Sequence, residues 1–299
     1  MVKGLKTKED FENMFPPDEL DEIGDRWLIR WRGSQKLRYR ICLNILRQAL
    51  ANSNKVLRVL DIGCGQSDFL LRLREMYPGH EYHGTDISEN VVAWNRRNYP
   101  FIKYQQIALP EIGFRPSTFD LICALEVLYY LEVPQQKVAL GNIVEALKPG
   151  GYLLLSGPLD GGKQYYAEDR IIQAVGRVMS IERVEYNYAR LYTYLEMFPL
   201  RALSLLRRIG ELLSLPNADF EQWAARRRGW IIGTVRIARQ RGTKRVVSLV
   251  TAALIWLLKT VLGWEWLPRL CFVLTKIALG NAGRTQIIIL ARKLGNQPY

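Results

Sequence analysis

Apolar runs alternate with segments of helical spacing through the first two thirds of the chain. The runs that we expect to form strands cover residues 55–62, 81–85, 102–105, 119–125 and 152–156. The segments between them that we expect to form helices cover residues 69–76, 91–98 and 136–147. A nearly continuous apolar run is typical of a parallel strand that is buried on both faces. The alternation therefore predicts an α/β fold with a doubly wound parallel sheet, whose ligands bind at the carboxyl ends of the strands.

The positive charge is concentrated in the last third of the chain. Residues 1–199 hold 25 Lys and Arg against 25 Asp and Glu, whereas residues 200–299 hold 17 against 4. All of the net charge of +13 therefore belongs to the last hundred residues. This division predicts a neutral part and a basic, apolar part, and the basic part is a candidate for contact with anionic surfaces.

Composition excludes several classes of protein. An apolar fraction of 48% over 299 residues excludes a disordered chain and supports a full buried core. The four cysteines lie far apart, without a CxxC pair or a histidine cluster, so we expect no disulfide framework, no metal site and a reducing cytoplasm. The first fifteen residues contain no apolar segment of the kind that a secretory signal needs, so we expect none.

A glycine loop follows the first expected strand, in the sequence DIGCGQSD at 61–68. Two glycines let the backbone turn tightly and approach a ligand, and Asp86 at the end of the second strand can accept hydrogen bonds from both ribose hydroxyls of a nucleoside. A dinucleotide site would need glycine where Asp68 stands, and this carboxylate would oppose a pyrophosphate at a helix N-terminus. The loop therefore favours a nucleoside without phosphates. S-adenosylmethionine, whose sulfonium is cationic, fits a loop flanked by Asp61 and Asp68.

Four stretches resemble, in order and spacing, the successive motifs of class I S-adenosylmethionine-dependent methyltransferases. They read VLDIGCGQSDFL, YHGTDIS, FDLICALEVLYYL and EALKPGGYLLLSGP, and the resemblance covers about residues 55–160. It implies a Rossmann-like sheet of seven strands, S-adenosyl-L-methionine as methyl donor and S-adenosyl-L-homocysteine as product. A tight turn and a helix cap could explain Gly-x-Gly and Asp86 separately, but the joint spacing disfavours that explanation.

The resemblance also implies which residues bind the cofactor. Asp61, Gly63 and Gly65 would line its methionine end, Asp86 would hold the ribose, and Ile87 would pack on the adenine. Such enzymes usually have an acidic residue near the adenine amino group, where this chain has Gln106, and the carbonyl oxygen of a glutamine can still accept that hydrogen bond. The remaining candidates at the cofactor site are Arg38, Cys64, Ile107 and Leu125.

The acceptor side of the site is expected after the fourth strand. Related enzymes often have a histidine near the position of Tyr130, but the only histidines here are His80 and His83, which we expect to be structural. Because a sulfonium is already an activated leaving group, methyl transfer needs mainly in-line placement and exclusion of water. We therefore expect an amine acceptor, or a hydroxyl served by the candidate catalytic residues Tyr129, Tyr130 or Glu126. The alternative role for the tyrosines is helix packing.

The string EVLYYL also resembles the nodulation-type N-methyltransferases, which act on amino sugars, and the upstream residues Asp25, Arg26, Trp27 and Gln35–Arg40 loosely match their pattern. The match implies a helical lid over residues 15–50, in which Arg38 pairs with the cofactor carboxylate. The alternative is an amphipathic helix whose arginines are solvated.

The basic third has its own pattern. Class I sheets close with a strand pair, expected here at 181–188 and 285–291, with close to a hundred residues between them. Apolar residues at helical spacing over 200–213 predict an amphipathic helix, and the longest charge-free stretch nearby, Val246–Leu258, has 13 residues against the ~20 that span a bilayer. Five tryptophans lie among the basic residues, as is typical of a membrane interface: Trp223, Trp230, Trp256, Trp264 and Trp266.

We therefore expect a helical lid at 1–54, a cofactor-binding core at 55–199, a helical insertion at 200–284 and a final strand and tail at 285–299. The insertion would rest on an anionic membrane or enclose an apolar substrate; the alternative is an ordinary helical cap packed on the sheet. The expected function is N- or O-methylation of a small, apolar or lipid-like molecule in secondary metabolism, by a cytoplasmic enzyme that also associates peripherally with membranes.

Two alternative functions remain. The basic third suggests nucleic-acid methylation, although CALEVLYY is not the Pro-Pro-aromatic type of motif and no RNA-binding module is evident. The other alternative is a membrane-associated scaffold that binds the cofactor without catalysis.

Overall fold

A sheet of seven strands lies at the centre of the molecule, in the order β3-β2-β1-β4-β5-β7-β6. The computed structural model describes residues 7–15, 17, 20, 32–51, 55–159, 167–225, 230–240, 244–264 and 266–295. Its strands are β1 (Arg58–Ile62), β2 (Glu81–Asp86), β3 (Lys103–Gln106), β4 (Phe119–Leu125), β5 (Leu147–Pro158), β6 (Ser180–Asn187) and β7 (Gln286–Arg292). β1 to β5 pair in parallel, and β7 runs antiparallel between β5 and β6. The predicted Rossmann-like sheet, with its closing strand pair, is confirmed.

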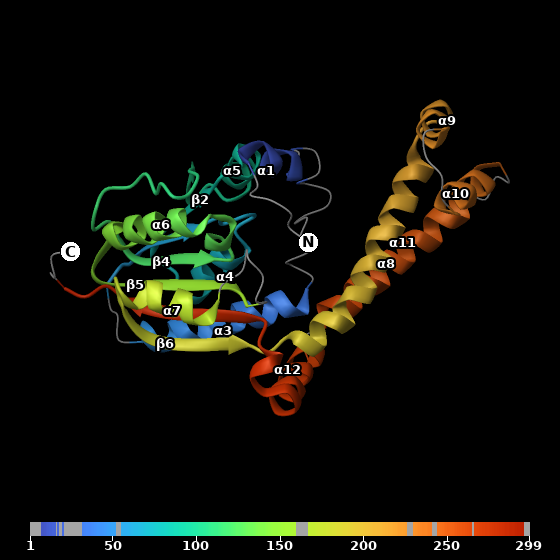
Figure 1. Ribbon diagram of the computed structural model, residues 1–299. Helices are drawn as coiled ribbons and strands as arrows, with labels where there is room; N and C mark the ends of the chain where they lie inside the picture. The colour runs from blue at the N-terminus through green and yellow to red at the C-terminus, as the bar shows by residue number, and fades with distance from the viewer. Residues whose placement is uncertain are drawn as a thin grey trace.

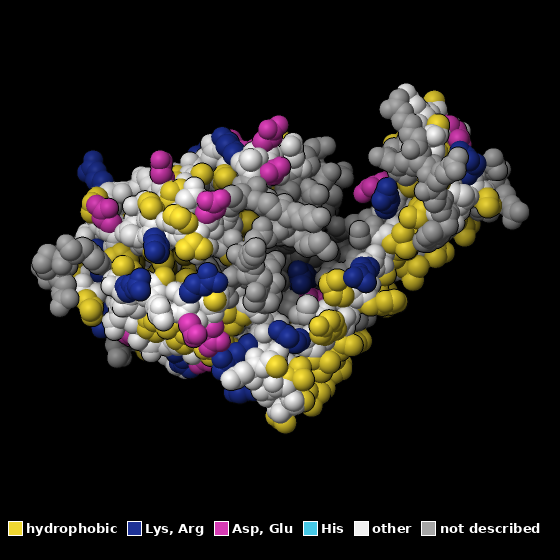
Figure 2. Space-filling view, in the orientation of Figure 1, with side chains coloured by type: hydrophobic (Ala, Val, Ile, Leu, Met, Phe, Trp, Pro, Cys, Tyr) yellow, Lys and Arg dark blue, Asp and Glu magenta, His cyan; other side chains and the backbone are white. Residues whose placement is uncertain are grey.

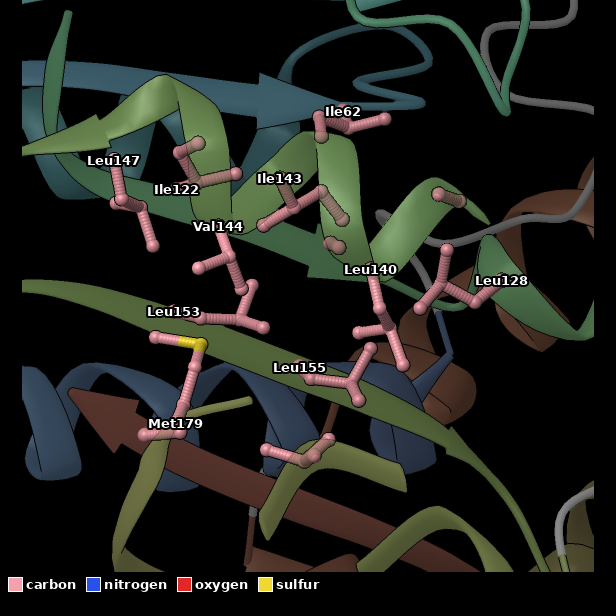
Figure 3. Close-up of a cluster of buried hydrophobic side chains, with 14 of the residues drawn as sticks. Ile62, Ile122, Leu128, Leu140, Ile143, Val144, Leu147, Leu153, Leu155 and Met179 are labelled. Carbon is pink, nitrogen blue, oxygen red and sulfur yellow. The ribbon is translucent and has the colours of Figure 1, made fainter. Parts of the chain in front are cut away.

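Helices cover both faces of this sheet (Figure 1). They are α3 (Gly33–Ala49), α4 (Asp68–Met76), α5 (Glu89–Asn98), α6 (Val133–Ala146) and α7 (Glu168–Gly176). A further helix, α1 (Lys8–Met14), lies beside α5 (Figure 1). Every residue of β4 is buried, as the continuous apolar run predicts for a central strand. One hydrophobic cluster joins β4 and β5 to α6, and Figure 3 shows Ile122 and Leu153 of the strands beside Ile143 and Val144 of the helix.

The helix α3 packs on the sheet, although it lies inside the segment that we expected to form a lid. Cys42, Ile45 and Leu46 are buried in a second cluster together with residues of β1 and α4. Arg38 is only 3% exposed, so the expectation of solvated arginines is wrong at this position. The residues Asp25, Arg26 and Trp27 of the predicted lid lie outside the described residues.

Five helices connect β6 to β7, and we call them together the helical arm. They are α8 (Arg190–Ser214), α9 (Asn217–Ala225), α10 (Trp230–Gln240), α11 (Lys244–Gly263) and α12 (Trp266–Leu279), followed by the short turn η2 (Gly280–Gly283). Figure 1 shows α8 and α11 pointing away from the sheet, with α9 and α10 at the far end of the arm and α12 at its base. This arrangement differs from a cap packed on the sheet. The first helix also begins at Arg190, ahead of the expected boundary at 200.

The arm has a small hydrophobic core of its own at the far end. Leu213 of α8, Phe220 of α9 and Val235 of α10 are its most buried members. Among the described helices, none combines the length and the apolar content that crossing a bilayer requires.

Candidate functional site

The glycine loop lies between β1 and α4, and its backbone takes conformations that favour glycine. Gly63 has φ +67° and Gly65 has φ +50°. A Cβ atom on Gly63 would lie 2.2 Å from Cγ1 of Val127, so a side chain cannot fit there. A Cβ atom on Gly65 would meet nothing within 4 Å. The loop therefore packs tightly at its first glycine and leaves open space at its second, where a ligand can approach the backbone.

Asp86 fixes this loop to the neighbouring strand. Its Oδ2 accepts a hydrogen bond of 3.0 Å from the amide of Gly65, and its Oδ1 accepts one of 3.0 Å from the amide of Ser88. The backbone of Ile87 also donates to this carboxylate, and since its two oxygens have four lone pairs in all, the carboxylate can still accept from a ligand. Burial raises the pKa of Asp86 even though these amides act in the opposite direction.

Asp61 is the second acidic group of the site. Burial, with the neighbouring charge of Asp86, raises the pKa of Asp61 to about 8, and Arg38 only partly offsets this rise. In the ligand-free protein Asp61 therefore holds a proton near neutral pH, and a cation bound beside it would favour its ionised form.

Cys64 and Asn95 complete the loop's surroundings. Asn95 Nδ2 donates a hydrogen bond of 2.6 Å to the carbonyl oxygen of Gly65 and lies 3.7 Å from Sγ of Cys64. Burial raises the pKa of the Cys64 thiol well above its usual range, so this thiol is inert. The sequence interpretation missed Asn95, because a single polar residue inside a helix gives no local signal.

The expected adenine side is formed by the ends of β2 and β3. Gln106 Nε2 donates a hydrogen bond of 3.0 Å to the carbonyl oxygen of Ile87, and the amide of Ile107 donates one of 3.0 Å to the carbonyl oxygen of Asp86. Because the amide nitrogen of Gln106 serves the backbone, its carbonyl oxygen is the atom suited to accept from a ligand. The assignment of this residue to the adenine amino group stays a prediction.

The N-terminal helix α1 reaches this edge of the sheet from outside the core. Glu12 accepts hydrogen bonds from Ser88 Oγ at 2.8 Å and from the amides of Glu89 and Asn90 at 2.7 and 3.3 Å. Phe11 meets Tyr130 edge to face, with ring centroids 5.4 Å apart. The helix therefore bridges the start of α5 and the turn η1 (Leu128–Tyr130), a role that the sequence interpretation did not assign to it.

Glu126 is the centre of a polar network at the end of β4. Its Oε1 lies 3.1 Å from Arg38 Nη1 and accepts hydrogen bonds from Ser156 Oγ at 3.2 Å and Gln286 Nε2 at 3.1 Å. Its backbone has φ +62°, which is unusual for a residue with a side chain. Such a conformation persists where the surroundings determine it, and it is typical of functional sites.

Arg38 pairs with Glu126 in this structure, whereas the sequence resemblance pairs it with the cofactor. Burial alone would lower its pKa, but the carboxylate of Glu126 outweighs this and holds the pKa above its usual value. The Nε atom of Arg38 is buried and has no hydrogen-bond partner among the described residues. A buried N–H of this kind is suited to an oxygen of a bound molecule, so the pairing of Arg38 with the cofactor stays a prediction.

The two candidate tyrosines lie against each other, with ring centroids 4.4 Å apart. Burial, with the charge of Glu126, raises the pKa of Tyr129 far above its usual value. This phenol therefore stays protonated and can donate a hydrogen bond, which argues against Tyr129 as a base.

His83 packs edge to face against Phe119 at 5.3 Å, as a structural histidine does.

A chain of hydrogen bonds runs from Glu126 to the helical arm. Gln286 Oε1 accepts from Asn187 Nδ2 at 2.8 Å, and the same Nδ2 lies 3.4 Å from the carbonyl oxygen of Ser34. Ser34 Oγ donates to Glu196 Oε2 of α8 at 2.7 Å. We call these residues, from Glu126 to Glu196, the polar chain. The sequence interpretation missed the last four, because their contacts join distant parts of the chain.

Comparisons with known proteins show the family to which the chain belongs. The sequence model of the family described as "Methyltransferase domain" matches residues 34–230. Nodulation protein S of Rhizobium tropici is 25% identical over 62% of this chain and 77% of its own length. Trans-aconitate 2-methyltransferase of Methylobacterium nodulans is 32% identical over 34% of this chain. The chain spans only 38% of that relative, and 5% of highly reducing polyketide synthase 2 of Gibberella zeae.

Solved structures of similar fold include the N-methyltransferase of Bradyrhizobium japonicum WM9 in complex with S-adenosyl-L-homocysteine. It is 21% identical, with a TM-score of 0.48, over 58% of this chain and 90% of that chain.

Proposed function

The chain belongs to the methyltransferase-domain family of class I S-adenosylmethionine-dependent enzymes, and we propose that its methyl acceptor is a small, apolar or lipid-like molecule. The observation that carries the proposal is the hydrogen bond from Gly65 to Asp86, beside the open space at Gly65. This hydrogen bond places two features side by side. One is a loop whose backbone a ligand can approach, and the other is a carboxylate that can accept hydrogen bonds from ribose hydroxyls.

The residues at the site fit S-adenosylmethionine. Asp61 is buried, and a neighbouring cation would stabilise its ionised carboxylate. The ammonium and sulfonium groups of the donor supply such a cation. Arg38 Nε offers an unpartnered N–H for the donor's carboxylate, and Gln106 offers a carbonyl oxygen for its adenine amino group. When bound, the donor supplies a methyl group on a positively charged sulfur, which is a good leaving group.

The acceptor side is proposed to work by direct displacement. The bond from the acceptor nitrogen or oxygen to the methyl carbon forms as the carbon–sulfur bond breaks, and the electron pair of that bond stays on sulfur. The acceptor's proton leaves to Glu126 or to water, and Tyr129 donates a hydrogen bond that orients the acceptor. The network of Arg38, Ser156 and Gln286 holds Glu126 in place for this role.

The cofactor part of the proposal is tested by calorimetry on a matched pair of glycine variants. Gly65 and Gly79 both have positive φ and open space at the Cβ position, but Gly79 lies in the turn before β2, away from the site. Gly65→Ala should weaken binding of S-adenosyl-L-homocysteine about tenfold or more, since its methyl group enters the ligand space, whereas Gly79→Ala should not. Tight binding of NADH, with no heat from the methyl donor or its product, would overturn the proposal.

The acceptor class is tested by incubating the protein with methyl-labelled S-adenosylmethionine and an extract of the cells that naturally make the protein. Label is expected in the organic phase, on molecules small enough to pass a filter that retains the protein. Label found only in nucleic acid would favour nucleic-acid methylation instead. Cofactor binding without any labelled product would favour the non-catalytic scaffold.

A further inference from the structure

The helix α11 of the arm contains no acidic residue, and it exposes a stripe of apolar side chains. Val246, Leu249, Val250, Trp256 and Leu257 are between 51% and 71% exposed. Their spacing of three, four and seven residues places them on one side of the helix. A stripe of this kind normally faces a protein core, but here the described residues leave it open to solvent.

The same pattern occurs on the two helices beside α11 at the base of the arm. The exposed apolar residues are Trp266, Leu270, Val273, Leu274 and Ile277 on α12, and Leu191, Tyr194, Leu195 and Phe198 on the first turns of α8. Figure 2 shows apolar side chains along one side of the arm, from its base toward its far end. We call these residues of α8, α11 and α12 the apolar band. Exposed apolar surface that extends over three helices marks an interaction site.

The charges around the apolar band identify the partner. Together α11 and α12 contain five basic residues, Lys244, Arg245, Lys259, Arg269 and Lys276, and no Asp or Glu. The third helix of the band, α8, contains four arginines and two glutamates. A second copy of the chain would bring like charges together in one interface. A nucleic acid would neutralise the charges but leave the apolar side chains in water. A partner that is both apolar and anionic satisfies both features, and an anionic bilayer has this chemistry.

We propose that the apolar band docks the helical arm on an anionic membrane, with its helices lying in the headgroup region. Exposed tryptophans favour this depth, and Trp256, Trp264 and Trp266 are 68%, 44% and 58% exposed. Basic residues on the same helices contact the anionic lipid headgroups while the apolar stripe enters the boundary of the acyl chains. Docking does not depend on methyl transfer.

The polar chain gives docking a consequence for the site, and this step rests on the proposed function. Glu196 at the base of α8 accepts a hydrogen bond from Ser34. The hydrogen bonds of the polar chain then continue through Asn187 and Gln286 to Glu126. The base of the arm is therefore fixed to the core rather than hinged on it. A docked arm holds the site close to the bilayer, so that an apolar acceptor can enter from the lipid phase.

The test is flotation of the full chain with vesicles of phosphatidylcholine alone or with added phosphatidylglycerol. Binding is expected to the anionic vesicles, and it should weaken as salt rises. The double variant Leu249→Glu/Trp256→Glu should lose affinity by about tenfold or more, because it places charge in the apolar band. The matched control Val56→Glu/Val138→Glu adds the same charge at exposed apolar residues of the core, at 65% and 53% exposure, and should bind as the wild type does.

Three outcomes would overturn the proposal. They are no binding to anionic vesicles at low salt, an equal loss of binding in the control variant, and a stable dimer at low salt that only the double variant breaks. Calorimetry with S-adenosyl-L-homocysteine on the double variant separates this inference from the proposed function. Cofactor binding should be unchanged in it, whether or not the vesicles bind.

Discussion

At the scale of single residues, Asp61 ties the stability of the ligand-free protein to pH. Its folded pKa of about 8 lies above its ordinary value near 4, so the folded state holds a proton that the unfolded state has released between these values. Its contribution to the free energy of unfolding therefore falls as pH rises from about 4 to about 8, by at most about 1.4 kcal/mol per unit. Urea unfolding of the wild type and of Asp61→Asn between pH 5 and 8 checks this, since the wild type should show the steeper decline. Parallel curves would contradict it.

The carboxylate of Asp86 acts directly on the glycine loop. Asp86→Ala removes the acceptor for Gly65 and Ser88, and we expect affinity for S-adenosyl-L-homocysteine to fall about tenfold or more, by calorimetry. Glu81→Ala, at the opposite end of the same strand, removes surface ion pairs with Arg58 and Lys103 and should leave that affinity unchanged. Equal losses in the two variants would show that β2 as a whole, rather than this carboxylate, determines binding.

At the scale of elements, Glu12 bonds α1 to the start of α5, beside Phe15, which packs on a cluster that contains Val91 and Trp94 of α5. Burial acts to raise the pKa of Glu12, but its hydrogen bonds from the backbone of α5 outweigh this and lower it. The contact is therefore complete above the ordinary pKa of a glutamate and is lost as pH falls through the lower folded value. In Glu12→Gln the start of α5 loses the charged carboxylate that caps its amides, and α1 is held less firmly. We therefore expect the amides of α1 to exchange with deuterium about tenfold faster. Glu9→Gln, on the same helix but exposed, should exchange as the wild type does.

The base of α8 depends in the same way on Glu196, which is almost fully buried. Glu196→Ala leaves Ser34 and Arg32 without their acceptor, so we expect a loss of about 2–4 kcal/mol in the free energy of unfolding. Deuterium exchange should rise in the first turns of α8 and at the start of α3. Glu211→Ala, at an exposed position of the same helix, should change stability by less than about 0.5 kcal/mol. If exchange rises equally in both variants, the anchor lies elsewhere.

The elements that the sequence predicts well are those whose signals are local. The strands follow apolar runs bounded by turns. Gly63 and Gly65 follow the first strand, and Asp86 ends the second strand at a fixed spacing from them. The pairing of Arg38 with Glu126 has no such signal, because it joins α3 to the end of β4 and either charge alone suggests a solvated or ligand-binding group. The direction in which the arm leaves the sheet also has no signal in the sequence. Helical spacing shows that α11 has an apolar side, but it does not show what covers that side.

At the scale of the whole molecule, charge and apolar surface occur on the same helices. The net charge of +13 keeps copies of the chain apart at low salt, although the apolar band would gain from burial. Screening reduces the reach of these charges to about 3 Å at 1 M salt. We therefore expect the wild type to sediment as a monomer at low salt and to self-associate at high salt, whereas Leu249→Glu/Trp256→Glu stays monomeric in both. Salt-independent sedimentation of the wild type would contradict this balance.

The position of β7 in the sheet has a consequence for the order in which the molecule is assembled during synthesis. β6 is an edge strand whose one neighbour is β7, and about a hundred residues separate the two in the chain. A ribosome therefore releases the entire arm before β6 has a partner and before Gln286 can reach Glu126. Chaperones or lipid that shield the emerging helices act on a nascent chain whose core is still open. Completion of the hydrogen-bond network around Glu126 is thus among the last events of folding.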